Sequence, residues 1–141
     1  MTKKGFTVLE LLIAVSVIGI LAIISVPIYK NIIPSFVLNS AIRETATDLR
    51  YAQQLAVTEQ IIHSVIFDKI TNSYSVKKGE DILLTKKLNN NIKLSDINGF
   101  SSNTINFIST GAVIEPGNIV LTSKEKNSTI EIKPSGYVRI Q

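Results

Sequence analysis

The chain has no cysteine and only one histidine among its 141 residues. The lack of cysteine excludes a disulfide framework and any cysteine-based site. His63 has no second histidine or cysteine with which to share a metal, so we expect a surface or helix-end residue. A G-x-S-x-G turn, a glycine-rich phosphate loop and an H-E-x-x-H pair are also missing. These absences argue against an enzyme, and the sequence predicts no cofactor.

Charge is nearly absent from the first thirty residues. An apolar run extends from Phe6 to Ile28, with Glu10 as its one charged residue. As a helix, this run would span about 34 Å, enough to cross a hydrocarbon core of about 30 Å. Lys3 and Lys4 precede it without a balancing acid, which predicts a cytoplasmic N-terminus and an exported remainder.

Three simpler interpretations of this run fit less well. A cleaved signal peptide needs an A-x-A site after the apolar region, where the sequence reads ISVPI. A plain membrane anchor has the right length but gives no reason for Glu10, because an acid inside a membrane helix costs about 2.5–3.5 kcal/mol. A buried core helix of this length would be unusual without charges.

The stretch GFTVLE, from Gly5 to Glu10, at the head of such a helix resembles the class III signal of type IV pilins and type II secretion pseudopilins. In that family a membrane prepilin peptidase cuts after the glycine and methylates the new first residue. The resemblance implies cleavage between Gly5 and Phe6, methylation of Phe6, and removal of Lys3 and Lys4 with the leader. Glu10 becomes the acid at the fifth mature position.

The resemblance also gives Glu10 a partner. A lone carboxylate in lipid needs an opposite charge. In an assembled filament, Glu10 would lie near the free α-amine of Phe6 of a neighbouring subunit and so set the register between subunits. The implied partners are other pilin subunits, the prepilin peptidase, the membrane and the assembly platform of the parent machine.

Net charge does not point to nucleic acid. The precursor carries +4, and loss of Lys3 and Lys4 lowers this to +2, so the sequence pI of 9.4 overstates how basic the mature chain is.

The apolar pattern continues past two prolines. Pro27 and Pro34 each remove a helical hydrogen bond, which predicts a bend rather than a stop; the alternative is that Pro34 ends one helix and begins another. From residue 35 to about 60 a stripe recurs every three or four positions: Leu38, Ile42, Thr45, Leu49, Ala52 and Ala56. Glu44 and Asp48, like charges four residues apart, indicate a solvated or partner-facing surface.

After His63 the pattern changes to period two, which indicates short strands separated by Gly, Pro and Asn turns. The predicted strands are 63–68, 73–77, 82–88, 92–94, 105–108, 118–123, 129–133 and 137–140. The fold class is therefore α+β: a long N-terminal helix, transmembrane then amphipathic, packed on a mostly antiparallel β-sheet. This is the arrangement that the pilin resemblance implies.

The second half of the chain narrows the resemblance to one group within the pilin family. The helix end LRYAQQLA followed by a first strand ending VIF, and the later INF, Gly111, GNIVL, IEI and GYVR segments, are similar to the GspH/FimT group of minor pilins. The implied organisation is a leader at 1–5, a transmembrane and polymerisation helix at 6–29, an amphipathic continuation at 30–62 and a β-rich head at 63–141.

Two other binding functions stay open. Some FimT-like pilins are linked to DNA uptake through a C-terminal Gly-Arg-x-Arg, which here reads Gly136-Tyr137-Val138-Arg139. A DNA site would draw on a group of basic and aromatic residues: Lys124, Lys126, Lys133, Tyr137 and Arg139. Glu80, Asp81 and Asp96 could contribute to a calcium site but match no loop pattern, so solvated turns are the simpler expectation and no metal site is predicted.

The sequence thus predicts a minor pilin or pseudopilin of a type II secretion system or a type IV pilus. It would cross the cytoplasmic membrane once, with its N-terminus inside and its head exported, and enter a pilus or pseudopilus through its N-terminal helix. The alternative is a DNA-binding minor pilin of a competence pilus that uses the C-terminal hairpin.

Overall fold

The computed structural model describes residues 5–124 and 126–141, without the side chains of residues 26–32. The chain divides into two compact units, Met1–Ile33 and Pro34–Gln141, which we call the N-terminal unit and the head unit. Helix α1 (Val8–Glu59) contributes to both and is continuous through both prolines. A stop at Pro34 is therefore wrong, and the continuous helix is the one predicted. The helix ends at Glu59, and the next residue, Gln60, adopts the left-handed conformation (φ 57°) common after helix C-termini.

The predicted stripe of the second half of α1 is confirmed. Its buried residues follow the helical period: Leu38, Ile42, Thr45, Ala46, Asp48, Leu49, Ala52 and Ala56. Burial of each leucine or isoleucine side chain contributes about 1.5–3 kcal/mol. Because this stripe and the inner faces of the strands form one cluster, the head cannot complete its core without the helix.

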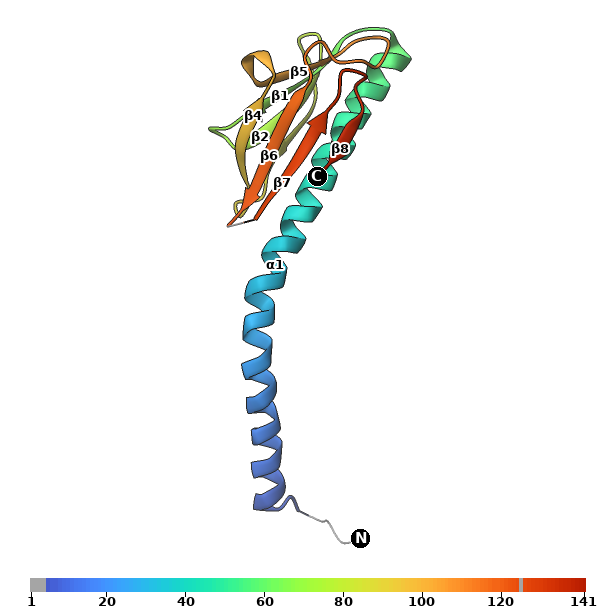
Figure 1. Ribbon diagram of the computed structural model, residues 1–141. Coiled ribbons are helices and arrows are strands. Elements are labelled where there is room, and N and C mark those ends of the chain that lie inside the picture. Colours follow the sequence, from blue (N-terminus) through green and yellow to red (C-terminus); the bar gives the residue numbers. More distant parts are fainter. Residues whose placement is uncertain (1–4, 125) are drawn as a thin grey trace. The chain divides into compact units, whose positions relative to one another are not determined.

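The head unit contains two antiparallel sheets of four strands each (Figure 1). The first has the order β3-β2-β1-β5, with β1 (His63–Asp68), β2 (Ser73–Lys78), β3 (Asp81–Lys87) and β5 (Thr104–Phe107). The second has the order β4-β6-β7-β8, with β4 (Lys93–Asn98), β6 (Gly117–Ser123), β7 (Lys126–Ile132) and β8 (Val138–Ile140). The α+β class with an antiparallel head is confirmed, whereas the division into two sheets was not predicted.

Most strand bounds lie within one residue of the sequence-based ones, two strands differ by three or more residues, and a short 3-10 turn, η1 (Ser101–Asn103), precedes β5. Strand β4 extends to Asn98, and its register against β6 shifts between Leu94 and Asp96. Such a bulge inserts one residue, so the buried Leu94 and Ile97 stand three apart and the alternation is hidden. Strand β7 begins at Lys126, three residues earlier than predicted.

One side-chain amide joins the two sheets. Asn72, in the turn between β1 and β2, accepts a hydrogen bond from Leu88 N on its backbone oxygen (2.9 Å). Its side chain donates to the carbonyl of Ile92 (2.6 Å) and accepts from the amide of Leu94 (3.0 Å), at the start of β4. These bonds fix the β3–β4 loop against the β1–β2 turn, so both lie at the same end of the head unit.

The last turn of the chain packs closely against the helix and the loop after β5. Gly136 has φ 79°, and an added Cβ would collide with the carbonyl oxygen of Gly111. That oxygen also accepts a hydrogen bond from Gln53 Nε2 of α1, at 2.7 Å. A glycine is required at position 136 both for its positive φ and for this close approach.

Candidate assembly interface

The first turn of α1 contains a reciprocal cap. Thr7 precedes the helix, its hydroxyl accepts a hydrogen bond from Glu10 N at 3.3 Å, and its amide donates to Glu10 Oε2 at 2.9 Å. The Thr7 hydroxyl also donates to Glu10 Oε2 at 2.9 Å. This is a capping box, T-x-x-E, in which two otherwise unpaired helix N–H groups are satisfied by side chains. Within a single chain, Glu10 thus has a local partner, a role that sequence reasoning missed although the spacing of three residues signals it.

The first eighteen residues of α1, which follow this cap, are not covered by any described part of the chain. Residues Val8–Ser25 have a mean hydropathy of 2.7 and are all exposed. An α-helix of 18 residues is about 27 Å long, close to the thickness of a hydrocarbon core. The hydroxyls of Ser16 and Ser25 donate to the carbonyls of Leu12 and Leu21, both at 2.7 Å, so neither needs a water partner. This surface is therefore suited to lipid or to other apolar helices.

The residues around the predicted cleavage point are accessible. Phe6 is 84% exposed, and nothing lies within 4 Å of a Cβ built at Gly5. Lys3 and Lys4 of the predicted leader lie outside the described residues.

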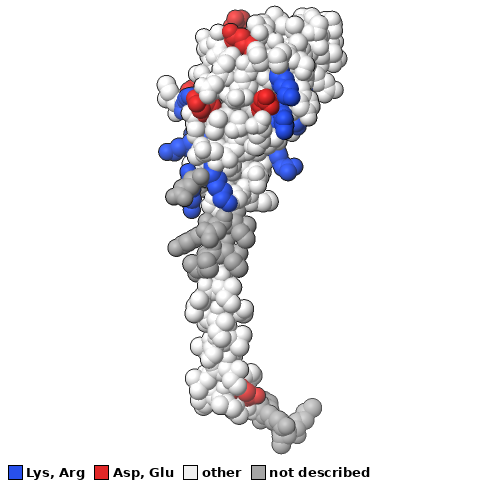
Figure 2. All heavy atoms as spheres, viewed as in Figure 1, with Lys and Arg blue, Asp and Glu red and all other residues white. Residues whose placement is uncertain are grey.

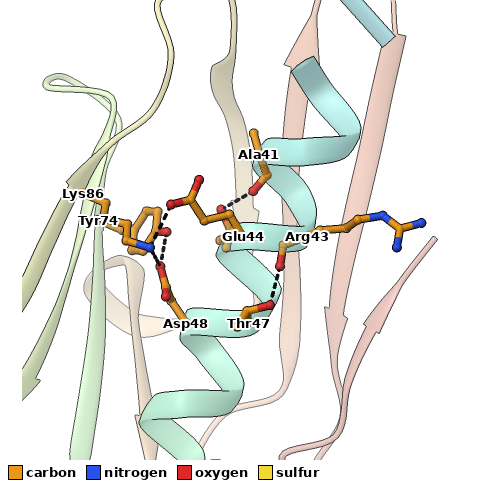
Figure 3. A network of polar contacts seen from close by, with 8 residues as sticks. Ala41, Arg43, Glu44, Thr47, Asp48, Tyr74 and Lys86 are labelled. Carbon is orange, nitrogen blue, oxygen red and sulfur yellow. Dashed lines mark hydrogen bonds and ion pairs between the residues drawn. The ribbon is translucent and has the colours of Figure 1, made fainter. Parts of the chain in front are cut away.

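In the head unit, four polar side chains fasten α1 to the first sheet (Figure 3). We call this group the polar clamp: Glu44 and Asp48 of α1, Tyr74 of β2 and Lys86 of β3. Lys86 Nζ lies 2.8 Å from both Glu44 Oε1 and Asp48 Oδ2, and the Tyr74 hydroxyl donates to Asp48 Oδ2 at 2.5 Å. Burial, with the Asp48 carboxylate as a second cause, raises the pKa of Tyr74, which stays neutral as a donor.

The polar clamp corrects one expectation. Glu44 and Asp48 do not form a simple solvated surface, because Asp48 is only 8% exposed and both acids face one lysine. Hydrogen bonds from the ammonium group to Asp48 and Glu44 raise the pKa of Lys86, so the amine stays charged. In contrast, Arg43 on the same turn points away from the clamp (Figure 3). The repulsion between Glu44 and Asp48 is offset by Lys86, which lies 38 residues after Asp48 in the sequence.

The surface position predicted for His63 is also wrong. The side chain is fully buried at the start of β1, with Nδ1 3.3 Å from the Ile61 carbonyl. Its Nε2 lies 3.2 Å from Glu59 Oε2, at ion-pair distance but without hydrogen-bond geometry. A hydrogen bond from Lys78 is the main cause that lowers the pKa of Glu59, whose Oε2 lies 3.0 Å from Lys78 Nζ. His63 is buried because the first residue of β1 lies on the inward face of the strand. A single histidine has no spacing pattern from which this could be predicted.

The structure separates the five residues predicted for a DNA site. Lys124 and Lys126 lie in and after the β6–β7 turn, and Lys126 Nζ donates to Ser35 Oγ at 2.6 Å. Lys133, Tyr137 and Arg139 lie at the opposite end of β7, about 20 Å away along the strand. Arg139 stands directly opposite Glu131 in the register of β7 and β8.

The acidic residues that could have contributed to a calcium site lie in different elements of the head unit. Glu80 lies in the β2–β3 turn, whereas Asp81 begins β3 and Asp96 lies within β4. Asp96 Oδ1 pairs with Lys69 Nζ at 3.4 Å. Among the described residues, no group of three His, Cys, Asp or Glu side chains could hold a metal ion.

Two family models match the chain. The prokaryotic N-terminal methylation motif matches residues 1–26, and the type II transport protein GspH matches residues 41–136, more than half of the chain. The chain belongs to the GspH family. The GspH match starts in the second half of α1 and ends at Gly136, so it covers the buried stripe from Ile42 onward and most of both sheets. The group predicted from the strand and glycine pattern is confirmed, and with it a pilin-type N-terminus.

Relatives of this GspH-family chain include pilins and pseudopilins. The type IV major pilin protein PilE of Neisseria gonorrhoeae is 27% identical over 129 residues, covering 92% of this chain and 72% of PilE. The crystal structure of the type IV minor pilin FimU of Pseudomonas aeruginosa matches with a TM-score of 0.61 and 18% identity, covering 74% of this chain and 87% of FimU. The minor pseudopilin EpsH from the Type 2 Secretion System of Vibrio cholerae also gives 0.61, with 12% identity, 74% of this chain and 95% of EpsH. At these identities, the two structures show that the fold is shared.

Proposed function

We propose that this chain is a minor pilin or pseudopilin subunit of a type IV pilus or a type II secretion system, with a structural rather than a catalytic role. A prepilin peptidase cuts it between Gly5 and Phe6 and methylates Phe6. The chain then crosses the cytoplasmic membrane once, with the N-terminus inside and the head outside, and the assembly platform inserts it into a filament. The observation that carries this proposal is the apolar helical segment Val8–Ser25, which begins with the Thr7–Glu10 cap and is exposed at every position.

The processing step is tested by the intact mass and N-terminal sequence of membrane-extracted protein, with and without the peptidase. We expect a mature chain that begins at methylated Phe6 only when the peptidase is present. Gly5→Val should block this product, and Gly19→Val is the matched control, because both glycines have open space around a built Cβ. Retention of Lys3 and Lys4 in the presence of the peptidase would contradict the proposed processing.

The role of Glu10 can be separated into its two parts. Glu10→Gln keeps a side-chain acceptor for the helix cap but removes the charge that would pair with the α-amine of a neighbouring Phe6. Thr7→Ala removes the cap but keeps the charge. We expect Glu10→Gln to lose incorporation into filaments and Thr7→Ala to retain it, measured as the sheared-filament fraction of processed subunit. The reverse result would assign Glu10 to helix capping alone.

DNA binding by the C-terminal hairpin stays a second prediction, reduced to one end of β7. Lys133, Tyr137 and Arg139 lie there together, and Arg139 faces the acidic Glu131. Salt-dependent binding of duplex DNA by the full chain in detergent, lost in Arg139→Ala, would support it. If Arg139→Ala bound DNA as well as the parent chain does, the DNA-binding prediction for this hairpin would be wrong.

A further inference from the structure

Lysines gather at one end of the head unit, which we call the basic end. Its members are Lys69 in the β1–β2 turn, Lys87 at the end of β3, Lys93 at the start of β4, and Lys124 and Lys126 around the β6–β7 turn. All five are exposed. Two acids accompany them, Asp68 and Asp96, and Glu125 lies between two of them in the sequence, outside the described residues. Figure 2 shows Lys and Arg side chains gathered toward this end, with acidic ones midway and at the far tip of the unit.

Three of these lysines surround one hollow of about 330 Å³. Lys69, Lys87 and Lys93 line it together with Asn90, and Asn72 contributes to its wall. Because Asn72 is bonded to Leu88, Ile92 and Leu94, the two loops that carry the lysines are held in place rather than splayed apart by their charge. Among the described residues, no ion pair involves Lys87 or Lys93, and Lys69 has only the exposed Asp96, a contact of low energy.

An apolar side chain lies beside the same hollow. Ile70, next to Lys69, is 96% exposed at the tip of the β1–β2 turn. Its turn is rigid, because the Asp68 carboxylate accepts hydrogen bonds from Ile70 N (2.8 Å) and Thr71 N (3.3 Å). Phe36, 71% exposed on α1, lines a second hollow with Lys87 and Asn89 at this end. Cations flanking exposed apolar side chains are typical of surfaces that lie on anionic lipid.

The basic end is the end of the head unit at which the chain enters it from the apolar span. Ser35 bonds to Lys126, so the head unit begins at this end. Pro34 follows Ser25, the last residue of the apolar span, by nine positions, and at a helical rise of 1.5 Å per residue this stretch is about 14 Å long. A lipid headgroup layer of about 5–8 Å and a Debye length of about 8 Å together cover such a gap.

We propose that the hollow lined by Lys69, Lys87 and Lys93, with Ile70 at its side, binds the phosphate headgroups of anionic phospholipids and holds the head unit against the membrane surface before assembly. The proposal rests on the proposed function only for the membrane anchor. A phospholipid is favoured over DNA because an exposed isoleucine gains nothing from a phosphate backbone in water, whereas it can enter the acyl boundary.

The absence of cysteine allows a direct test on the full chain. A dye on Asn91→Cys reports the basic end, and one on Glu80→Cys reports the far end; both positions are exposed. The full chain is reconstituted into vesicles of phosphatidylcholine, alone or mixed with phosphatidylglycerol, with a headgroup-labelled lipid as energy acceptor. We expect energy transfer from position 91, but not from position 80, to rise when phosphatidylglycerol is present and to fall in high salt.

Charge variants sharpen the test. Each lysine near an anionic surface is worth about a fivefold change, so Lys87→Gln with Lys93→Gln should lower the ratio of membrane-apposed to free heads roughly 25-fold. Lys77→Gln with Lys133→Gln, at the other end, is the matched control and should leave it unchanged. Equal transfer in both lipid mixtures, or equal loss in both double variants, overturns the proposal. Duplex DNA bound at Lys87 and Lys93 without any phosphatidylglycerol effect would reassign the site and overturn it too.

Failure of this inference is distinguishable from failure of the proposed function. A chain that resists carbonate extraction but shows no lipid-dependent transfer retains its anchor and lacks only the headgroup site. Extraction of the chain by carbonate would contradict the proposed function itself, because a membrane-anchored subunit should resist it.

Discussion

The two halves of helix α1 have the same backbone structure and opposite surroundings. Between Val8 and Ser25 every side chain is exposed, including large ones such as Leu12 and Ile18. Between Leu38 and Ala56 one side of the helix is buried completely. The second half is stabilised by its own chain, whereas the apolar surface of the first half needs lipid or another helix. A single helix thus serves as part of a folded core and as a surface for a different environment.

The largest difference between the two halves of α1 is expected when a leucine in each half is truncated to alanine. Leu49 is fully buried and Leu12 is 60% exposed on the same helix. Leu49→Ala should lower the free energy of unfolding of the head by about 2–5 kcal/mol, since it removes buried methyl groups and leaves a cavity. Leu12→Ala should change it by less than about 0.5 kcal/mol. Chemical denaturation of the detergent-solubilised chain, followed by the β-sheet circular dichroism signal, measures both; equal effects would contradict the division.

A smaller effect is expected from the polar clamp. Asp48→Ala leaves the Tyr74 hydroxyl without its acceptor and Lys86 with Glu44 alone, which should cost about 1–3 kcal/mol. Arg43→Ala is the control on the same turn and should lie within about 0.5 kcal/mol of the parent. A double-mutant cycle of Asp48→Ala and Lys86→Ala should show non-additive losses. Additive losses would mean that the helix is held to the sheet by its apolar stripe alone.

The smallest effect is the pH dependence of the head. The hydrogen bond from Lys78 lowers the pKa of Glu59 below its usual 4.5, so this stabilisation is present above that pH and is lost as the pH falls through the folded value. Lys86 has a pKa raised above its usual 10.5, so its contribution is present below that pH and is lost as the pH rises further. These two groups should therefore add no pH dependence to the melting temperature between these limits. Glu59→Gln should weaken the acid arm and Lys86→Gln the alkaline arm, while an unchanged profile would exclude both.

Features that depend on near neighbours could be predicted from the sequence. The stripe from Leu38 to Ala56 follows from helical spacing, and most strands follow from alternation and turn residues. The segment from Gly5 to Glu10 has its pattern within six residues, so the family was predicted from it and is confirmed.

Features that depend on distant residues could not be predicted. The cation that joins Glu44 and Asp48 comes from β3, and no local pattern pairs Lys86 with them. The bulge in β4 conceals the buried Leu94 and Ile97 from a period-two search. The basic end is likewise assembled from three separate turns, so its lysines appear in the sequence as unrelated surface residues.

The hydrogen bonds of Asn72 bear on how the head unit reaches its folded form. Many small exported folds depend on a covalent crosslink, whose formation takes seconds to hours and requires an oxidant. Here the two sheets are joined by an amide side chain that bonds Ile92 and Leu94. These hydrogen bonds need no oxidant, because no thiol takes part in them. The head is therefore equipped to reach its final form under anaerobic or reducing conditions without a folding catalyst for disulfides.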